Sequence, residues 1–449
     1  MVDTRESDVT SEAASERMPL GLKVGWAFGS VGTILVIQTY QQVLLFYLTT
    51  VVGVAAATAG TLLLVGKLLD AGFAPAVGSA SDRADTRWGR RRPFLFAGAI
   101  VAAVGVATVF HPTELGNGAL PLVAVGLAVL ALGYSLFNVP YITMPVEMTD
   151  SPQERTSLIS WRIAFISAGG IFAGFLPKLA ESLGGGLDGY GEMGLILGVV
   201  IATAMLIACF ASGRARQTQR AVKPAGGNWA AVFESRDFML LLVAKVFQLI
   251  GLASTLASIL FLWKIVMKAD LALLGYYGAF ASGATILSMP MWTRVSRGRS
   301  KRGLYVLGCL GFSAVALTWT LAGPGEPFAL TCVRAVAGGL FSGLLLLMGQ
   351  SLLPDVIDAD CKRTGERREG AYAAAYSVVE KVSTAVGPFL IGAILAWFGF
   401  KPGPNVVQSA GVETGVIIGA AILPALFYAL SVIPLLAMYR GTRAVPVTA

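Results

Sequence analysis

The chain has 449 residues, of which 55% are hydrophobic and only 13% are charged. A water-soluble domain carries roughly 25% charged residues, so this composition excludes a protein built from soluble domains and indicates that most of the surface faces lipid. The formal net charge is +8. The basic residues lie in short segments between apolar runs instead of alternating with aromatic residues, which argues against a nucleic-acid partner.

Residues 1–22 form a polar N-terminal tail, which lacks the apolar stretch of a signal peptide. Because a bilayer core about 30 Å thick requires roughly 20 apolar residues per helix, the apolar runs that follow are interpreted as membrane spans. In the N-terminal half, at 23–212, we expect spans near 24–50, 55–80, 93–111, 119–147, 156–181 and 190–212. After a basic linker at 213–237, the C-terminal half, at 238–440, is expected to span near 238–267, 271–293, 302–322, 326–352, 370–399 and 411–439. Residues 441–449 form a short tail.

The loops between these spans are alternately basic and neutral. The loops after spans 2, 6, 8 and 10 are rich in Lys and Arg, whereas 111–120 and 323–327 contain neither. Since Lys and Arg concentrate in cytoplasmic loops, both termini and the central linker are predicted to be cytoplasmic. The Arg-rich loop after span 2 has a counterpart after span 8, which resembles the paired halves of the major facilitator superfamily, whose solute site lies between them. A twelve-helix protein without this symmetry is the alternative.

Few ionisable residues fall inside the predicted spans, where each costs at least ~2.5 kcal/mol unless it faces a cavity or a partner. Lys67 and Asp70 stand three residues apart, and one interpretation is that they only neutralise each other on one helix face. Lys245 lies near a predicted helix end and is interpreted as extending to the membrane surface. Lys381 lies too deep in its span for that. We therefore predict a functional role for Lys381, facing Asp70 across a central cavity.

Three segments carry a resemblance to a known family. They are Asp70-Ala-Gly-Phe-Ala-Pro with residues 81–93, residues 138–162, and residues 355–370 followed by Lys381. In this order, they resemble the span 2, span 4–5 and loop 10–11 signatures of the glycoside–pentoside–hexuronide:cation symporters. This family includes the melibiose permeases and is distantly similar to the sodium-dependent lysophosphatidylcholine symporters. The resemblance extends over nearly the whole chain.

The resemblance implies an all-α polytopic membrane protein of twelve transmembrane helices with the major facilitator fold, in a bacterial cytoplasmic (inner) membrane. It implies a monomeric secondary transporter that moves a small-molecule solute with H⁺ or Na⁺ by alternating access, without a bound cofactor. A glycoside or related sugar is the expected solute, and an amphiphile or organic anion is the alternative. A non-transporting receptor or scaffold is the competing class. An enzyme is not expected, because the sequence lacks the common hydrolase and nucleotide-binding motifs.

In the family, two aspartates one turn apart on span 2 bind the cation. Asp70 matches the first, but Ala74 stands at the second, and Asn138 stands at a further acidic position on span 4. A hard cation needs several oxygen ligands, and the lost carboxylate argues against a conventional Na⁺ site. Asp70 and Asn138 are the predicted cation-coupling residues, with Asp70 as the position for any Na⁺.

The family's sugar-holding aspartate and stacking tryptophan are replaced by Ile34 and Ile142, whereas Arg162 and Lys381 match basic positions of the family. The implied pocket is more apolar and more cationic than a galactoside site. The predicted solute-binding residues are Ile34, Tyr141, Ile142, Arg162 and Lys381.

The Arg-rich segment before span 3 is predicted to turn at Gly89 and to begin the helix at Pro93. Its arginines are expected to pair with acidic residues, including some of the other half, on the cytoplasmic face. Such contacts would hold the outward-facing state. The predicted gating residues are Asp82, Arg83, Arg87, Gly89, Arg90, Arg91, Arg92, Glu147, Arg155, Asp355, Asp358, Arg367 and Arg368.

Overall fold

The computed structural model describes residues 18–149, 151–214, 234–364, 369–404 and 406–438. Within these ranges, twelve helices are long and apolar enough to cross a membrane, which confirms the predicted number of spans and the all-helical class. The N-terminal half consists of α2 (Leu20–Gln38), η1 (Thr39–Val43), α3 (Leu44–Phe46), η2 (Tyr47–Val51), α4 (Ala56–Arg83), α5 (Arg92–Phe110), η3 (Gly116–Ala119), α6 (Leu120–Met148), α7 (Pro152–Gly174), α8 (Leu176–Ser182), α9 (Gly186–Ala211) and η4 (Ser212–Arg214).

The C-terminal half repeats this arrangement with six further spans. It consists of α11 (Arg236–Phe261), η5 (Leu262–Met267), α12 (Leu271–Val295), α13 (Lys301–Leu317), η6 (Thr318–Leu321), α14 (Phe328–Thr364), α15 (Glu369–Trp397), α16 (Ala410–Ile417), η7 (Ile418–Ile422), α17 (Leu423–Leu430) and α18 (Val432–Ala437). Short segments such as η1, α3 and η2 continue the preceding helix, so that residues Leu20–Val51 form one span.

Local sequence signals determine where several helices begin. Gly89 has φ +88°, in the left-handed region that favours glycine, and it forms the turn before α5. Pro93 lies in the first turn of α5, where no backbone donor is needed. The hydroxyl of Ser151 accepts a hydrogen bond from the backbone N–H of Glu154 (3.4 Å) at the start of α7. Glycine, proline and serine residues between the spans therefore help to set where the next helix begins.

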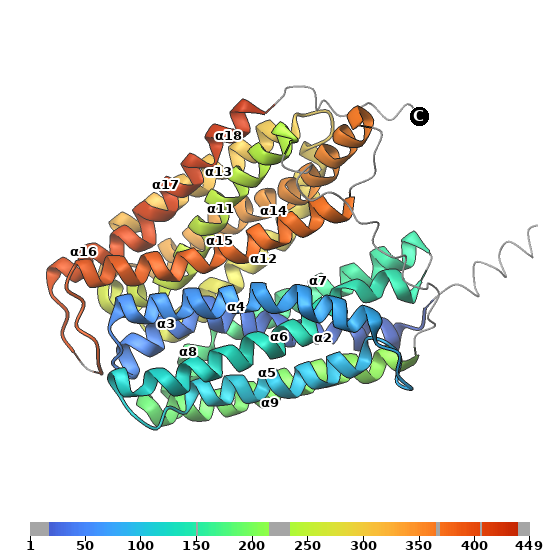
Figure 1. Ribbon diagram of the computed structural model, residues 1–449. Coiled ribbons are helices and arrows are strands. Elements are labelled where there is room, and N and C mark those ends of the chain that lie inside the picture. Colours follow the sequence, from blue (N-terminus) through green and yellow to red (C-terminus); the bar gives the residue numbers. More distant parts are fainter. Residues whose placement is uncertain (1–17, 150, 215–233, 365–368, 405, 439–449) are drawn as a thin grey trace, which may run out of the picture.

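The two halves lie side by side and make contact through α4 with α15 and through α7 with α12 (Figure 1). Small residues allow this close approach. A Cβ atom at Gly60 of α4 would lie 3.1 Å from the backbone of Phe389 on α15, and one at Gly174 would lie 3.4 Å from the Cα of Gly275 on α12. Glycine is therefore needed at Gly60 for the two halves to meet at this distance.

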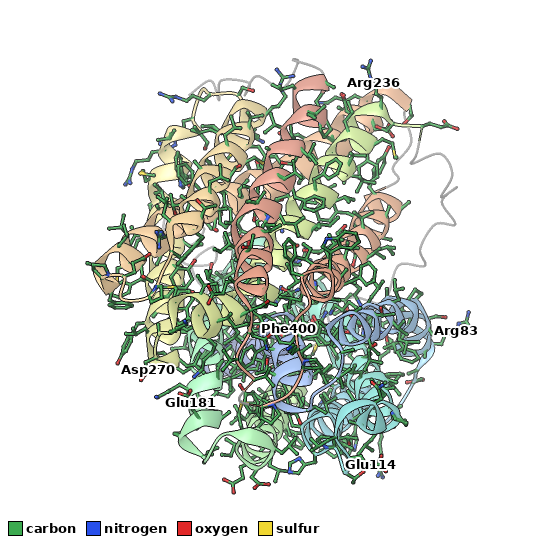
Figure 2. The ribbon with its side chains drawn as sticks, turned by 90° about the vertical axis from the view of Figure 1, so that its left-hand side faces the viewer. Arg83, Glu114, Glu181, Arg236, Asp270 and Phe400 are labelled. Atoms are coloured by element: carbon green, nitrogen blue, oxygen red, sulfur yellow. The ribbon has the colours of Figure 1, made fainter. Side chains whose placement is uncertain are left out.

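The bundle has two distinct ends. We call the end where α4 leads into α5 and α12 leads into α13 the basic end, because residues 83–92 and 294–302 lie there. At the opposite end, Lys264 pairs with Glu181, and Lys178 of α8 lies 3.0 Å from Oδ1 of Asp270, so ion pairs join the two halves. Figure 2 shows Glu181 and Asp270 on this face. The halves meet at the opposite end and diverge towards the basic end (Figure 1).

One predicted span boundary and one predicted side-chain position are wrong. Helix α14 continues to Thr364, about three turns beyond the predicted end at 352. Asp355 and Asp358 therefore lie on a helix and not in a loop, because an apolar run marks only the part of a helix that is inside lipid. Lys245 does not extend to the surface: it is 7% exposed and its Nζ donates to Oε1 of Gln248 (2.9 Å). A buried polar partner removes its need for water.

Candidate solute and cation site

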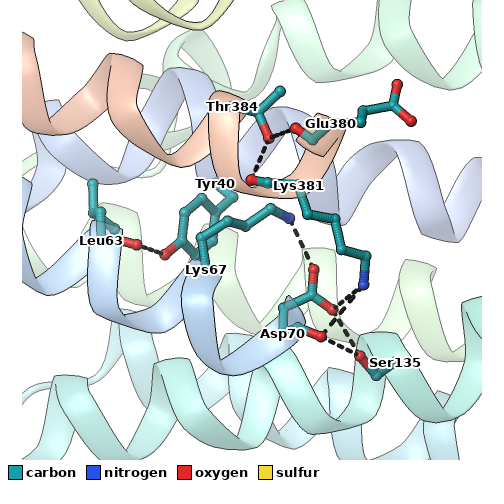
Figure 3. Close-up of polar contacts among 8 residues, drawn as sticks. All are labelled: Tyr40, Leu63, Lys67, Asp70, Ser135, Glu380, Lys381 and Thr384. Carbon is teal, nitrogen blue, oxygen red and sulfur yellow. Dashed lines mark hydrogen bonds and ion pairs between the residues drawn. The ribbon is translucent and has the colours of Figure 1, made fainter. Parts of the chain in front are cut away.

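An ion cluster centred on Asp70 joins the two halves in the middle of the bundle. Asp70, on α4, is 2% exposed. Its Oδ1 accepts hydrogen bonds from Nζ of Lys381 on α15 (3.0 Å) and from the hydroxyl of Ser135 on α6 (2.7 Å). Its Oδ2 lies 3.3 Å from Nζ of Lys67, one turn earlier on α4. Figure 3 shows the two lysines approaching the carboxylate from different helices.

The helical spacing of Lys67 and Asp70 places both on the same face of α4. The ammonium of Lys67 also lies 5.3 Å from the ring centroids of Tyr40 and Tyr134, and that of Lys381 lies 6.0 Å from the ring of Tyr134. Aromatic faces stabilise a desolvated cation by about 0.5–2 kcal/mol. The cluster therefore keeps two ammonium groups and one carboxylate inside the membrane-spanning region, where isolated charges are costly.

A cavity of about 390 Å³ lies against this cluster and between the halves. Its lining includes three cationic side chains and two carboxylates, which are Lys67, Arg162, Lys381, Asp70 and Glu380. We call it the charged cavity. Ile142, which lines it from α6, is 47% exposed, and Glu380 is also exposed. Because the halves are in contact at the opposite end, the charged cavity opens towards the basic end.

Arg162, on α7, has no ion-pair partner among the described residues. Its Nε is buried and makes no hydrogen bond with any described group, while its Cζ lies 5.8 Å from the ring centroid of Tyr141. A guanidinium has five N–H donors and pairs with carboxylate, sulfonate or phosphate groups through two parallel bonds. The charged cavity thus presents an unsatisfied donor for an anionic group.

The structure brings six of the seven predicted coupling and solute residues to one cavity. Ile34, Asp70, Asn138, Ile142, Arg162 and Lys381 all line it. Tyr141 does not line the charged cavity, which corrects that prediction. Its ring stacks between Trp26 and Phe137, with centroid distances of 4.7 and 5.1 Å. Its hydroxyl is 2.7 Å from that of Ser30. Adjacent residues on a helix point to different faces. Ile142 lines the cavity, so its neighbour Tyr141 points into the core.

Several lining residues were not predicted from the sequence. Ser377 and Thr384 flank Lys381 on the same face of α15. The i, i+3 and i, i+4 spacing around the charged residues is the signal that predicts them. Glu380, the neighbour of Lys381 in the chain, also lines this cavity.

Most of the predicted gating residues make contacts within one half. Arg91 pairs with Asp82 (2.8 Å) and with Glu147 (2.8 Å), and Arg90 also pairs with Glu147 (2.5 Å), so α4, α5 and α6 are joined at the basic end. Nε of Arg92 donates to the carbonyl of Cys209 (3.2 Å).

The other gating contacts that the structure describes also lie within one half. Lys301 pairs with Asp355 (2.6 Å) within the C-terminal half, and Lys362 pairs with Asp358 (2.7 Å) along α14. Nε of Arg155 donates to the carbonyl of Thr149 (2.9 Å). Arg83 and Arg87 lie at the basic end. Arg367 and Arg368 lie outside the described residues. Among the residues that the structure describes, no ion pair joins the halves at the basic end, which agrees with their divergence there.

Twelve spans in two halves around a charged central cavity define a secondary transporter of the major facilitator superfamily. Residues 25–440 match the model of the MFS/sugar transport protein family, and the chain belongs to this family, within the glycoside–pentoside–hexuronide symporter group. It is a cation-coupled transporter of a small-molecule solute and a multi-pass protein of the bacterial inner membrane.

The chain is 30% identical to the uncharacterized symporter YnaJ of Bacillus subtilis over 428 residues, covering 92% of this chain and 90% of that protein. It is 26% identical to the glucuronide carrier protein homolog of Escherichia coli over 416 residues, covering 91% and 90%. Among solved structures, it resembles a bacterial homolog of the human lysosomal transporter Spinster, with a TM-score of 0.66, 13% identity, and coverage of 95% and 98%. The last similarity concerns the fold alone.

Proposed function

We propose that this protein transports a sugar-like organic anion together with a proton. The observation that carries the proposal is the charge balance of the charged cavity, with three cationic and two anionic side chains and a guanidinium at Arg162 that has no ion-pair partner among the described residues. An anionic group would satisfy that guanidinium. A glycoside that carries a carboxylate meets this requirement, and the name of the glucuronide carrier homolog points to the same chemistry in a relative.

The proton is favoured over Na⁺ by the environment of Asp70. Both carboxylate oxygens already face an ammonium group, Lys381 at 3.0 Å and Lys67 at 3.3 Å. No group of three or more His, Cys, Asp or Glu side chains that could hold a metal occurs among the described residues. Ala74 adds no oxygen one turn beyond Asp70. A hard cation would have to displace an ammonium and find further ligands, whereas a proton needs only one oxygen.

Proton and anion would assist each other through Lys381. Protonation of Asp70 removes the attraction that holds Lys381 across the halves, and the released ammonium then faces the cavity beside Arg162. An anionic solute compensates this freed positive charge. By linkage, each of the two ligands raises the affinity for the other. Loss of the contact between α4 and α15 at this point also frees the two halves to rearrange, which is what alternating access requires.

Uptake of glucuronate into proteoliposomes tests the proposal. An imposed proton gradient should drive accumulation, an equal Na⁺ gradient should not, and galactose should compete at least about tenfold more weakly than glucuronate. Accumulation driven by Na⁺ at constant pH would contradict proton coupling. Equal competition by the neutral sugar would contradict the anionic solute.

A further inference from the structure

Glu380 carries a charge that the coupling cluster does not use. It lines the charged cavity from α15 and is exposed there, and no ion pair joins its carboxylate to another described residue. Figure 3 shows the carboxylate directed away from Asp70, although the next residue in the chain, Lys381, contacts Asp70. Consecutive residues on a helix point about 100° apart. One of the two therefore joins the cluster, while the other presents a carboxylate to the cavity.

Arg162 is the complementary charge on the other half. It lines the same cavity from α7, and its Nε is buried without an acceptor in the described part of the chain. The hydroxyl of Tyr134, in the wall of this cavity, lies within electrostatic range of both Arg162 and Glu380. A guanidinium and a carboxylate, neither with an ion-pair partner among the residues that the structure describes, thus face one cavity from opposite halves.

The other charged groups of the cavity already contact one another. Lys67 and Lys381 lie 3.3 and 3.0 Å from the carboxylate oxygens of Asp70. Before any solute binds, the charges left over are those of Arg162 and Glu380, one of each sign. Water can solvate both while the cavity is open. When the cavity closes and water leaves, an unpaired ion inside the membrane becomes costly, so each of the two requires a partner.

We propose that Glu380 takes the place of the solute's anionic group at Arg162 when the empty transporter closes at the basic end. The guanidinium then has an anionic partner in both closed forms, which is the solute in the loaded form and Glu380 in the empty one. A symporter must return empty once in every cycle, and this pair would permit that step. The proposal rests on the proposed binding of an anionic solute at Arg162 and specifies the group that replaces it.

Lys245 is the alternative partner for Glu380, since the charges of the two residues interact. Its Nζ is buried, donates to Oε1 of Gln248 (2.9 Å) and lies 6.0 Å from the ring centroid of Tyr376. Lys245 lies on α11, in the same half as Glu380. A pair between these two residues would therefore not join the halves, and the experiment must distinguish it from the pair with Arg162.

Flux measurements on Glu380→Gln in proteoliposomes test the proposal. Net efflux of glucuronate requires return of the empty transporter and should slow by about tenfold, whereas exchange of labelled for unlabelled glucuronate bypasses that step and should stay within about twofold. The number of protons moved per solute should not change. Glucuronate should bind more tightly, because a competing carboxylate is removed, while galactose binding should not change. Glu192→Gln is the matched control, since this exposed glutamate of α9 does not line the charged cavity, and it should alter none of these quantities.

Spin-label distances between α4 and α12 across the basic end identify the partner of Glu380. Without solute, Glu380→Gln should reduce the population that is closed at this end, and added glucuronate should restore it. In the Arg162→Gln background, Glu380→Gln should cause no further change, because the pair is already lost. In the Lys245→Gln background, the effect of Glu380→Gln should persist.

Equal slowing of efflux and exchange, or no change in either, would overturn the proposal. An altered number of protons per solute would also overturn it, because Glu380 would then carry a proton itself. An effect that disappears with Lys245→Gln and persists with Arg162→Gln would assign the pair to Lys245 instead.

Glu380→Asp keeps the charge and should recover much of the net flux, which guards against misfolding of the glutamine variant. If the protein moves galactose and not glucuronate, the same comparison of efflux with exchange is made with galactose. Selective slowing of galactose efflux would then support the pair of Glu380 with Arg162, and only the anionic solute would be wrong.

Discussion

The ammonium of Lys381 on α15 lies 3.0 Å from Oδ1 of Asp70 on α4, so an ion pair joins the two halves of the transporter beside the cavity. The two residues are 311 positions apart in the chain. If alternating access separates α4 from α15, any group that competes for this carboxylate would influence which state of the transporter is populated.

Asp70→Asn is expected to uncouple transport. The amide resembles a protonated carboxyl and cannot lose its proton, so glucuronate should still exchange across the membrane while accumulation driven by a proton gradient is lost. Counterflow and gradient-driven uptake in the same proteoliposomes measure both quantities, and retained accumulation would contradict the role of Asp70.

We expect the ammonium of Lys67 to supply the positive charge beside Asp70 that a coupling Na⁺ would otherwise supply. Replacing it with methionine and restoring a carboxylate one turn after Asp70, in Lys67→Met/Ala74→Asp, removes an ammonium and adds two oxygens. This double variant should gain stimulation of binding by Na⁺, whereas Ala74→Asp alone should not, because Lys67 still neutralises the cluster. The measurement is solute affinity with and without Na⁺ at fixed ionic strength. Stimulation of the unmodified protein by Na⁺ would sink this interpretation.

Arg162→Gln should weaken binding of anionic solutes by about 10- to 100-fold, the range expected when a charged hydrogen-bonding partner is lost. Neutral sugars should be affected far less. Arg162→Lys should restore only part of the affinity, since an ammonium lacks the paired donors of the guanidinium. Isothermal titration with glucuronate and galactose distinguishes this pattern from a general loss of folding, which would weaken both ligands alike.

Closure of the opposite end is expected to depend on Glu181, which contacts both Lys178 and Lys264. Glu181→Gln removes both attractions and should shift the population towards states open at this end, as measured by spin-label distances between α8 and α12.

The neighbouring bridge from Lys178 to Asp270 should withstand moderate acidity. The backbone N–H of Ala272 and then Lys178 lower the pKa of Asp270, so its carboxylate stays charged, and the bridge is lost only as pH falls through that lowered pKa. In the Asp70→Asn background, the distances should therefore not change from pH 8 to pH 5.

Twelve spans and two halves follow from the sequence because lipid imposes a simple rule on it: every span must be about 20 apolar residues long, and charges inside a span are conspicuous. The same rule singles out Asp70 and Lys381 without any knowledge of their neighbours, whereas Arg162 was predicted from the family resemblance. It fails for the end of α14, because a helix that continues into water no longer obeys it.

The sequence predicts that Lys381 faces Asp70, but only the tertiary structure shows that the two are in contact and where the other residues lie. Packing of α4 against α15 places Lys381 on Asp70, turns Tyr141 into the core, and keeps Lys245 buried beside Gln248. The sequence by itself determined which charges lie in the membrane, since their cost there depends on position along a single helix. Their pairing, and the spaces between them, depend on contacts between helices hundreds of residues apart, which no local pattern encodes.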